Sequence, residues 1–319
     1  MSAVPPSAPA RRRLLSAALL ALPLAALGGC AVQTRGVRAS RPADLPPRVE
    51  LADTPFFPDE RFHCGPAALA TVLTAAGLPT DPQRVTGQVF VPGREGSLQI
   101  EMLAAARRGG AVATVLPDTL EALLREVASG HPVVVLSNLG LSWAPSWHYA
   151  VVVGYDLDEG EMLLRSGPME RQRMAMRTFE HTWARARHWA FVALPPERLP
   201  ATAREADAVR ALVAFERTAP PERAALAYAT ALQRWPGNLV LGIGLGNARY
   251  AAGDLAGAEA AFRAAAERHA SSAAWNNLAV VLDERGRRDE AITAARRAVE
   301  LASADDASPR ETLRRLTGG

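Results

Sequence analysis

The sequence predicts an α+β domain over residues 55–200, followed by an all-α repeat domain over residues 201–319. In the first part, segments of helical pattern precede apolar runs of strand length, which is the order of an α+β domain. In the second part, Ala-rich helical segments recur at a period of about 33 residues. Pro195, Pro196 and Pro200 mark the boundary between the two parts.

Residues 1–29 have the features of a lipoprotein signal peptide. A basic cluster, Arg11–Arg13, precedes an apolar run that is too short for a comfortable membrane span. The run ends in Leu-Gly-Gly-Cys30, which resembles the bacterial lipobox, whose cysteine is acylated. We therefore expect lipid on Cys30. Because Ala31 follows it, and not Asp, we expect a cell-envelope lipoprotein at the outer membrane, facing the periplasm. The alternative is an ordinary signal peptide that contains a cysteine.

Residues 30–54 are rich in Pro, Arg and small side chains without apolar periodicity, so we expect a tether between membrane and folded domain. The formal net charge of +3 becomes near neutral when the basic cluster leaves with the signal peptide. Composition therefore gives no argument for nucleic acid. The expected partners are a peptide or protein, and the membrane through the lipid.

Cys64 lies where a turn-rich segment meets an apolar helix. Gly65 lets the backbone turn, Pro66 suits the first turn of a helix, and Ala67–Ala76 is apolar throughout. Helix N-terminal N–H groups and the helix dipole favour a thiolate, as a nucleophile requires. The alternative is that Cys64 is not a nucleophile and serves only as a small, buried apolar side chain. Lipid on Cys30 would leave Cys64 without a disulfide partner, which favours a role of Cys64 as nucleophile. The spacing of the two cysteines suggests no metal site, and we expect no cofactor.

Helix caps and apolar runs predict the remaining elements of the first domain. Asp81 caps one helix, Ser97 caps a second, and the capping box of Asp118 and Glu121 begins a third. The expected helices are 81–89, 97–108, 118–128 and 178–186, and the expected strands are 111–116, 132–137, 149–155, 161–165 and 189–194.

Among the six histidines, His148 is the best candidate for a catalytic base. It directly precedes the apolar strand Tyr149–Tyr155 and follows Trp143 and Trp147, whose rings would shield it from water. Taken alone, a histidine in this position would be a structural residue. Together with Cys64 it can act as a general base and acid.

These motifs carry a family resemblance over residues 55–194. Phe-Phe-Pro at 56–58, Cys-Gly-Pro-Ala-Ala-Leu-Ala at 64–70 and Trp-His-Tyr-Ala-Val-Val-Val-Gly-Tyr-Asp at 147–156 resemble papain-like cysteine peptidases. More narrowly, they resemble bacteriocin-processing (double-glycine leader) peptidases and related lipoproteins that carry tetratricopeptide repeats. The resemblance implies that Cys64 is the nucleophile and His148 the base, with the Cys64 N–H as one oxyanion donor.

Two positions depart from this pattern. The family usually has a Gln before the Cys as an oxyanion donor, and the nearest candidate here is Asp59. An ionised carboxylate only accepts hydrogen bonds, so Asp59 would oppose the oxyanion unless it is protonated or Arg61 substitutes for it. The family also places an Asp or Asn after the strand that follows the histidine. Ser166 is the positional match here, so we expect a Cys/His dyad with Ser166 as a weak third member.

The repeats of the second domain resemble tetratricopeptide repeats. Gly253, Ala258, Phe262 and Ala265 recur 33 residues later as Gly286, Ala291, Ala295 and Ala298, and Ala224, Tyr228 and Ala231 belong to an earlier copy. Small residues let paired helices approach, while Tyr228 and Phe262 fill the gap between them. Such arrays form concave peptide-binding surfaces. The alternative is a plain Ala-rich helical bundle.

The sequence thus favours a membrane-anchored cysteine peptidase whose repeats recruit a substrate or partner. The alternative is an adaptor lipoprotein whose degenerate peptidase-like domain binds peptides without cutting them; Asp59 and Ser166 favour it. Acyl transfer to an amine would use the same dyad.

Overall fold

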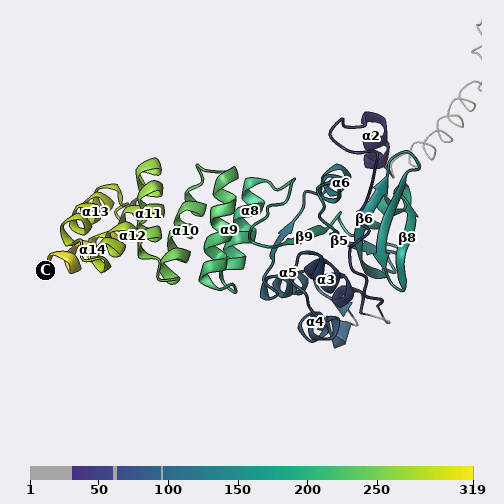
Figure 1. The fold of residues 1–319 in the computed structure, drawn as a ribbon, viewed down its shortest axis with the longest axis horizontal. Helices are drawn as coiled ribbons and strands as arrows, with labels where there is room; N and C mark the ends of the chain where they lie inside the picture. Colours follow the sequence, from purple (N-terminus) through teal and green to yellow (C-terminus); the bar gives the residue numbers. More distant parts are fainter. Residues whose placement is uncertain (1–30, 60–62, 95, 319) are drawn as a thin grey trace, which may run out of the picture.

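The computed structural model describes residues 31–59, 63–94 and 96–318. A sheet domain lies at one end, and helices extend from it in a row to the C-terminus (Figure 1). Within these residues no helix combines the length and apolarity that a membrane crossing needs. The expected signal peptide and the expected lipidation site Cys30 lie outside the described part.

The first domain is built on one antiparallel sheet of strand order β4-β9-β5-β6-β7-β8, with β1 pairing to β6. The strands are β1 (Arg48–Glu50), β4 (Val112–Val115), β5 (Val133–Asn138), β6 (Trp147–Asp156), β7 (Glu161–Ser166), β8 (Met169–Ala175) and β9 (Ala190–Leu194). A separate two-stranded ribbon, β2 (Phe90–Val91) with β3 (Gly96–Ser97), flanks the short 3-10 helix η1 (Pro92–Arg94).

Helices cover both faces of the sheet, which explains why its central strands are apolar without interruption. One apolar cluster joins one face to α3 (Cys64–Ala75), α4 (Pro82–Val89) and α5 (Gln99–Arg108). The other joins the opposite face to α2 (Val32–Ser40), α6 (Leu120–Ala128) and α7 (Met176–Ala184). In β5, Val134 belongs to the first cluster and Val133 to the second, as the alternation of a strand requires.

The prediction of a tether over residues 30–54 is wrong for the described residues 31–54. They form α2 and β1, which pack on the domain. Glu180 of α7 accepts hydrogen bonds from the backbone N–H groups of Gln33 (3.0 Å) and Thr34 (2.7 Å), so it caps the first turn of α2. That cap comes from a residue distant in sequence, and α2 buries little apolar surface. Neither feature is visible in the local sequence.

Other differences are smaller. α5 begins after Leu98, and Ser97 lies in β3 instead of capping it. β6 begins at Trp147, so His148 lies within the strand and not before it. Strand β8 was not expected, because its charged and exposed residues give no apolar run. The other expected helices and strands are present with small shifts at their ends.

The second domain consists of antiparallel helix pairs. Its helices are α8 (Glu205–Glu216), α9 (Pro221–Arg234), α10 (Leu239–Ala251), α11 (Leu255–His269), α12 (Ser272–Glu284), α13 (Arg288–Leu301) and α14 (Ser308–Thr317). The expected role of small residues is confirmed on α10. A Cβ at Gly244 would lie 2.4 Å from the Tyr228 ring, and one at Gly246 would lie 2.4 Å from the Phe262 ring. Each aromatic side chain therefore fits only because it faces a glycine.

A buried carboxylate joins the two domains. Glu126 of α6 is fully buried and accepts from the N–H groups of Ala201 (3.2 Å) and Thr202 (2.7 Å) and from the Thr202 hydroxyl (2.5 Å). His131 Nδ1 lies 2.8 Å from the same carboxylate. Val112 of β4 extends the contact, since it packs in the cluster formed by α8 and α9. The repeats thus begin from a fixed point on the sheet domain.

We expect Glu126→Ala to lower the free energy of unfolding by about 3–5 kcal/mol, because several buried donors lose their acceptor. Denaturant unfolding of the whole chain measures the loss. The control is Glu121→Ala on the same helix. Glu121 has only the Arg125 ion pair at the surface, so this change should cost about 1 kcal/mol or less. Equal losses in the two variants would contradict the role given to Glu126.

Candidate active site

Cys64 is the first residue of α3, and close packing fixes its position. The helix is apolar on all sides, with Leu69, Val72 and Leu73 buried against the sheet. A Cβ at Gly65 would lie 2.5 Å from Ser97 Oγ and 2.8 Å from Ser97 Cβ. Gly65 is therefore required by the close approach of β3, and the turn expected at this glycine is not its main role. This contact holds the start of α3, and with it the thiol, against the rest of the domain.

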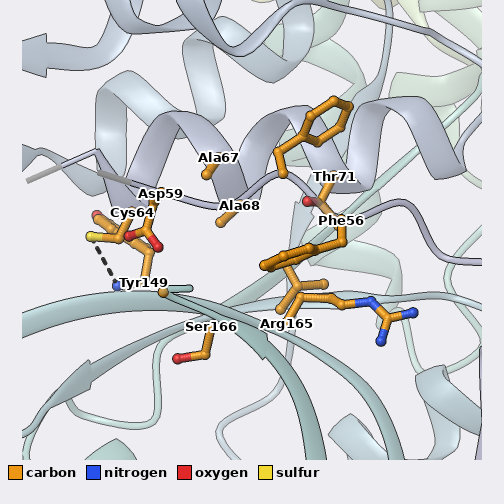
Figure 2. Close-up of a pocket in the computed structure, with 12 residues that line it drawn as sticks. Phe56, Asp59, Cys64, Ala67, Ala68, Thr71, Tyr149, Arg165 and Ser166 are labelled. Carbon is orange, nitrogen blue, oxygen red and sulfur yellow. Dashed lines mark hydrogen bonds between the residues drawn. The ribbon is translucent and has the colours of Figure 1, made fainter. Parts of the chain in front are cut away.

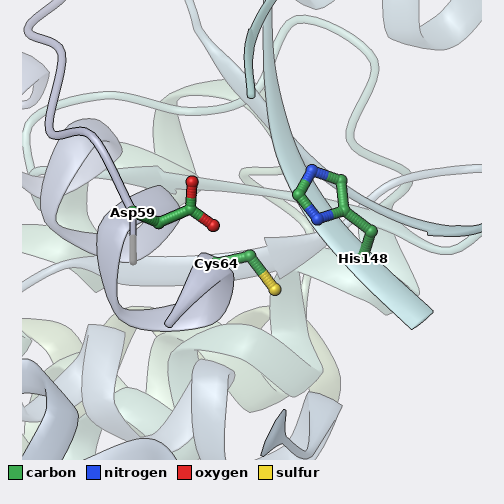
Figure 3. Close-up of side chains that lie close together, drawn as sticks. All are labelled: Asp59, Cys64 and His148. Atoms are coloured by element: carbon green, nitrogen blue, oxygen red, sulfur yellow. The ribbon is translucent and has the colours of Figure 1, made fainter. Parts of the chain in front are cut away.

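His148 reaches the thiol from strand β6. One ligand atom of Cys64, one of His148 and one of Asp59 all lie within 4.8 Å of one another (Figure 3). His148 Nε2 lies 2.9 Å from Ser166 Oγ, which holds the ring from β7. The backbone N–H of Tyr149 donates to Cys64 Sγ at 3.4 Å (Figure 2). The other imidazole nitrogen, Nδ1, thus remains for proton exchange with the thiol.

Asp59 lies beside this pair, on the segment that leads into α3. Its backbone N–H donates to Gly167 O at 3.4 Å. Its Oδ1 is buried and has no hydrogen-bond partner among the residues the structure describes. Burial raises the pKa of Asp59, and the nearby charge of His148 offsets part of that rise. Asp59, the nearest candidate for the amide donor that the resemblance implies, is thus a half-buried carboxyl beside the thiol.

The electrostatics favour a neutral thiol beside a neutral imidazole. Burial raises the pKa of Cys64, the Tyr149 N–H lowers it, and the negative charge of Asp59 raises it further. Burial also lowers the pKa of His148, against the opposing effect of Asp59. The direction of the Cys64 pKa shift thus contradicts the lowering expected from the helix N-terminus. In this arrangement the thiolate forms when His148 accepts its proton.

A pocket runs from Cys64 along α3. Small side chains of α3, Ala67, Ala68 and Thr71, form one wall, with Phe56 beside them (Figure 2). Arg165 of β7 closes the other side and is itself buried. Its guanidinium donates to the carbonyl oxygens of Ala52, Thr54 and Glu170 at 2.6–3.2 Å. Arg165 thereby holds the chain before Phe56 against the sheet and shapes the pocket.

The structure brings together four of the residues singled out from the sequence: Cys64, His148, Ser166 and Asp59. Asp156, the other carboxylate near His148 in sequence, lies at the far end of β6, where it bonds Arg48. Sequence reasoning missed the Tyr149 N–H and the anchoring by Arg165. The Tyr149 contact depends on tertiary geometry. Arg165 gives no sequence signal beyond a charged residue in an apolar strand.

Residues 47–191 match the family model described as the Peptidase_C39 like family. The first domain is therefore a C39-peptidase-like domain, and its mixed helix-and-sheet fold precedes a helical region that resembles tetratricopeptide repeats. No curated protein matches the sequence.

Solved structures match each domain separately. A C39-like peptidase from Bacillus anthracis is 18% identical, with a TM-score of 0.39 over 46% of this chain and 97% of that one. A double-glycine motif protease solved with its leader peptide is 20% identical, with a TM-score of 0.35 over 45% of this chain and 93% of that one. The repeat protein YrrB is 20% identical, with a TM-score of 0.32 over 35% of this chain and 58% of that one.

Substitution of Asp59 tests the electrostatics of the site. Asp59→Asn removes the negative charge that raises the pKa of Cys64, so the midpoint of its alkylation by iodoacetamide should move to lower pH. Mass spectrometry of the alkylated peptide at each pH gives the midpoint. The exposed Asp53→Asn, six residues earlier, is the control and should leave the midpoint unchanged. An unchanged midpoint in Asp59→Asn would contradict the coupling between carboxylate and thiol.

Proposed function

We propose that this C39-peptidase-like domain hydrolyses peptide bonds, with Cys64 as nucleophile and His148 as general base and acid. His148 takes the thiol proton while Sγ attacks the carbonyl carbon, and it then gives that proton to the leaving amine. The resulting thioester is hydrolysed by a water molecule that His148 deprotonates. Ser166 acts as a positioning residue, because it bonds the imidazole nitrogen that faces away from the thiol.

The observation that carries the proposal is the placement of a thiol and an imidazole, each with its own orienting partner. The Tyr149 N–H directs Cys64 Sγ, and Ser166 Oγ directs His148. Cys64 lines a pocket, and His148 precedes Tyr149, which lines it too. A structural cysteine needs none of these features.

The pocket and its rim favour a peptide with apolar side chains. Ala67, Ala68 and Thr71 give the α3 wall a mostly apolar surface without charge. The loop between β5 and β6, which leads to His148, carries no charge and exposes three large apolar side chains, Leu139, Leu141 and Trp143. Trp147, the first residue of β6, is exposed as well. We infer that this loop contacts apolar parts of the substrate.

Non-cutting peptide binding is the second candidate, and Asp59 is the observation that favours it. An ionised Asp59 would repel the oxyanion of the tetrahedral intermediate. A protonated Asp59 could donate to it instead. Burial, which raises the pKa of Asp59, favours the protonated form relative to an exposed aspartate. The balance between these two states decides how fast the site can turn over.

The remaining parts of the chain fit recruitment of a substrate. The helical repeats offer a surface for a peptide or protein partner. Acylation of Cys30 would hold the enzyme at the outer membrane, facing the periplasm. In that arrangement the repeats and the pocket would act on proteins of the cell envelope.

Hydrolysis of a proteome-derived peptide library, with mass spectrometry of the products, tests the proposal. Cys64→Ala and His148→Ala should abolish cleavage. Asp59→Gln should raise kcat/KM by about 10- to 100-fold, because an amide donor replaces a repelling carboxylate. The exposed Asp53→Asn serves as control and should cleave like the wild type. Failure of both wild type and Asp59→Gln to cleave, with peptides retained by the protein, would support the binder instead.

A further inference from the structure

Three side chains each bring one possible metal-ligand atom into the same small region of the site. Asp59 comes from the segment before α3, Cys64 from the first position of α3, and His148 from β6 (Figure 3). A carboxylate oxygen, a thiol sulfur and an imidazole nitrogen lie within 4.8 Å of one another. The arrangement differs from a simple Cys/His pair because of the carboxylate.

The chemistry of this donor set favours a transition-type cation such as Zn²⁺ over Mg²⁺ or Ca²⁺. Thiolate and imidazole suit Zn²⁺, whereas Mg²⁺ and Ca²⁺ prefer oxygen ligands only. Zinc sites with three protein ligands keep a fourth position for an exchangeable ligand. Tetrahedral bonds of about 2.0–2.3 Å place ligand atoms about 3.3–3.7 Å apart, so donors that lie within 4.8 Å of one another need to approach by at most about 1.5 Å. Side-chain rotation supplies a movement of that size.

The groups around the three donors are those that a zinc site requires. Ser166 Oγ lies 2.9 Å from His148 Nε2, which leaves Nδ1 as the ligand atom. The Tyr149 N–H points at Cys64 Sγ from 3.4 Å and would stabilise a coordinated thiolate. Asp59 Oδ1 is buried without a hydrogen-bond partner in the described part of the chain, so a cation would give it one. The pocket supplies access to the fourth position.

We propose that Asp59, Cys64 and His148 form a Zn²⁺ site and that bound Zn²⁺ reversibly masks the Cys64 nucleophile. That Zn²⁺ masks a catalytic nucleophile rests on the proposed peptidase function, whereas the existence of the Zn²⁺ site does not. On binding, the thiol releases its proton to solvent, and its sulfur donates an electron pair to the metal. His148 Nδ1 donates another pair, so it can no longer accept a proton from the thiol. The site then passes between a free, reactive state and a metal-bound, inactive one.

The test uses the metal-stripped full chain and two readouts that do not need activity. Competition with a chromophoric chelator gives the Zn²⁺ affinity and stoichiometry, and Co²⁺ substitution should give a thiolate-to-cobalt charge-transfer band. Protection of Cys64 from iodoacetamide by Zn²⁺ measures the masking of the thiol. We expect one Zn²⁺ per chain. Asp59→Asn should weaken binding by about tenfold or more, with protection shifted to the same degree.

Two variants are controls for the assignment of ligands. Asp53→Asn changes an exposed carboxylate on the same segment. His63→Gln removes the imidazole of the residue next to Cys64; the His63 ring packs on Phe90. Both should bind Zn²⁺ like the wild type. Unchanged affinity in Asp59→Asn, loss of binding in His63→Gln, or absence of the cobalt–thiolate band would each overturn the site.

Failure of the site and failure of the peptidase function give different results. If peptides are cleaved and Zn²⁺ neither binds at Cys64 nor inhibits, the zinc inference is wrong and the peptidase stands. If Zn²⁺ binds with the expected ligand dependence and protects Cys64 while no peptide is cleaved, the site stands and the peptidase proposal is wrong.

Discussion

The contact between the start of α3 and strand β6 is the constraint on which the rest of the site depends. α3 is apolar on every side, so it is stable only where the sheet and neighbouring helices bury it. Gly65 permits its first turn to lie against Ser97 without room for a Cβ. The Tyr149 N–H then meets Cys64 Sγ, and the adjacent His148 is brought to the same thiol. Packing of a buried helix thus determines the chemistry at its end.

Asp59 changes what this pair of groups can do. A carboxylate beside the thiol disfavours the thiolate and favours a protonated imidazole, as its effects on the pKa of Cys64 and of His148 indicate. Asp59 is also the nearest candidate for the oxyanion donor that the resemblance implies, and it completes the three donors that we propose as zinc ligands. Slow hydrolysis, peptide binding and control by metal are therefore linked through one side chain.

The sequence allowed much of the fold and site to be predicted, because the signals were local. Cys64 precedes an apolar run of helical pattern and His148 precedes an apolar run of strand length, and the family resemblance predicted that the two side chains lie close together. The packed segment 31–54 was missed because Glu180, far away in sequence, caps its helix. The predicted direction of the Cys64 pKa shift was wrong, because the prediction considered the helix N-terminus but neither burial nor the charge of Asp59. The first error comes from a contact between residues far apart in sequence, and the second comes mainly from burial by the fold, which local patterns do not encode.

Cys64 and His148 should form a neutral thiol beside a neutral imidazole when no substrate is bound, and their protonation states test this most directly. NMR titration of the full chain, with ¹³C at cysteine Cβ and ¹⁵N in histidine rings, reports both groups; Cys64→Ser and His148→Gln assign the signals. We expect a neutral Cys64 thiol and a neutral His148 imidazole at about pH 7.5, since burial raises the pKa of the thiol and lowers that of the ring. A thiolate–imidazolium pair at that pH would contradict it.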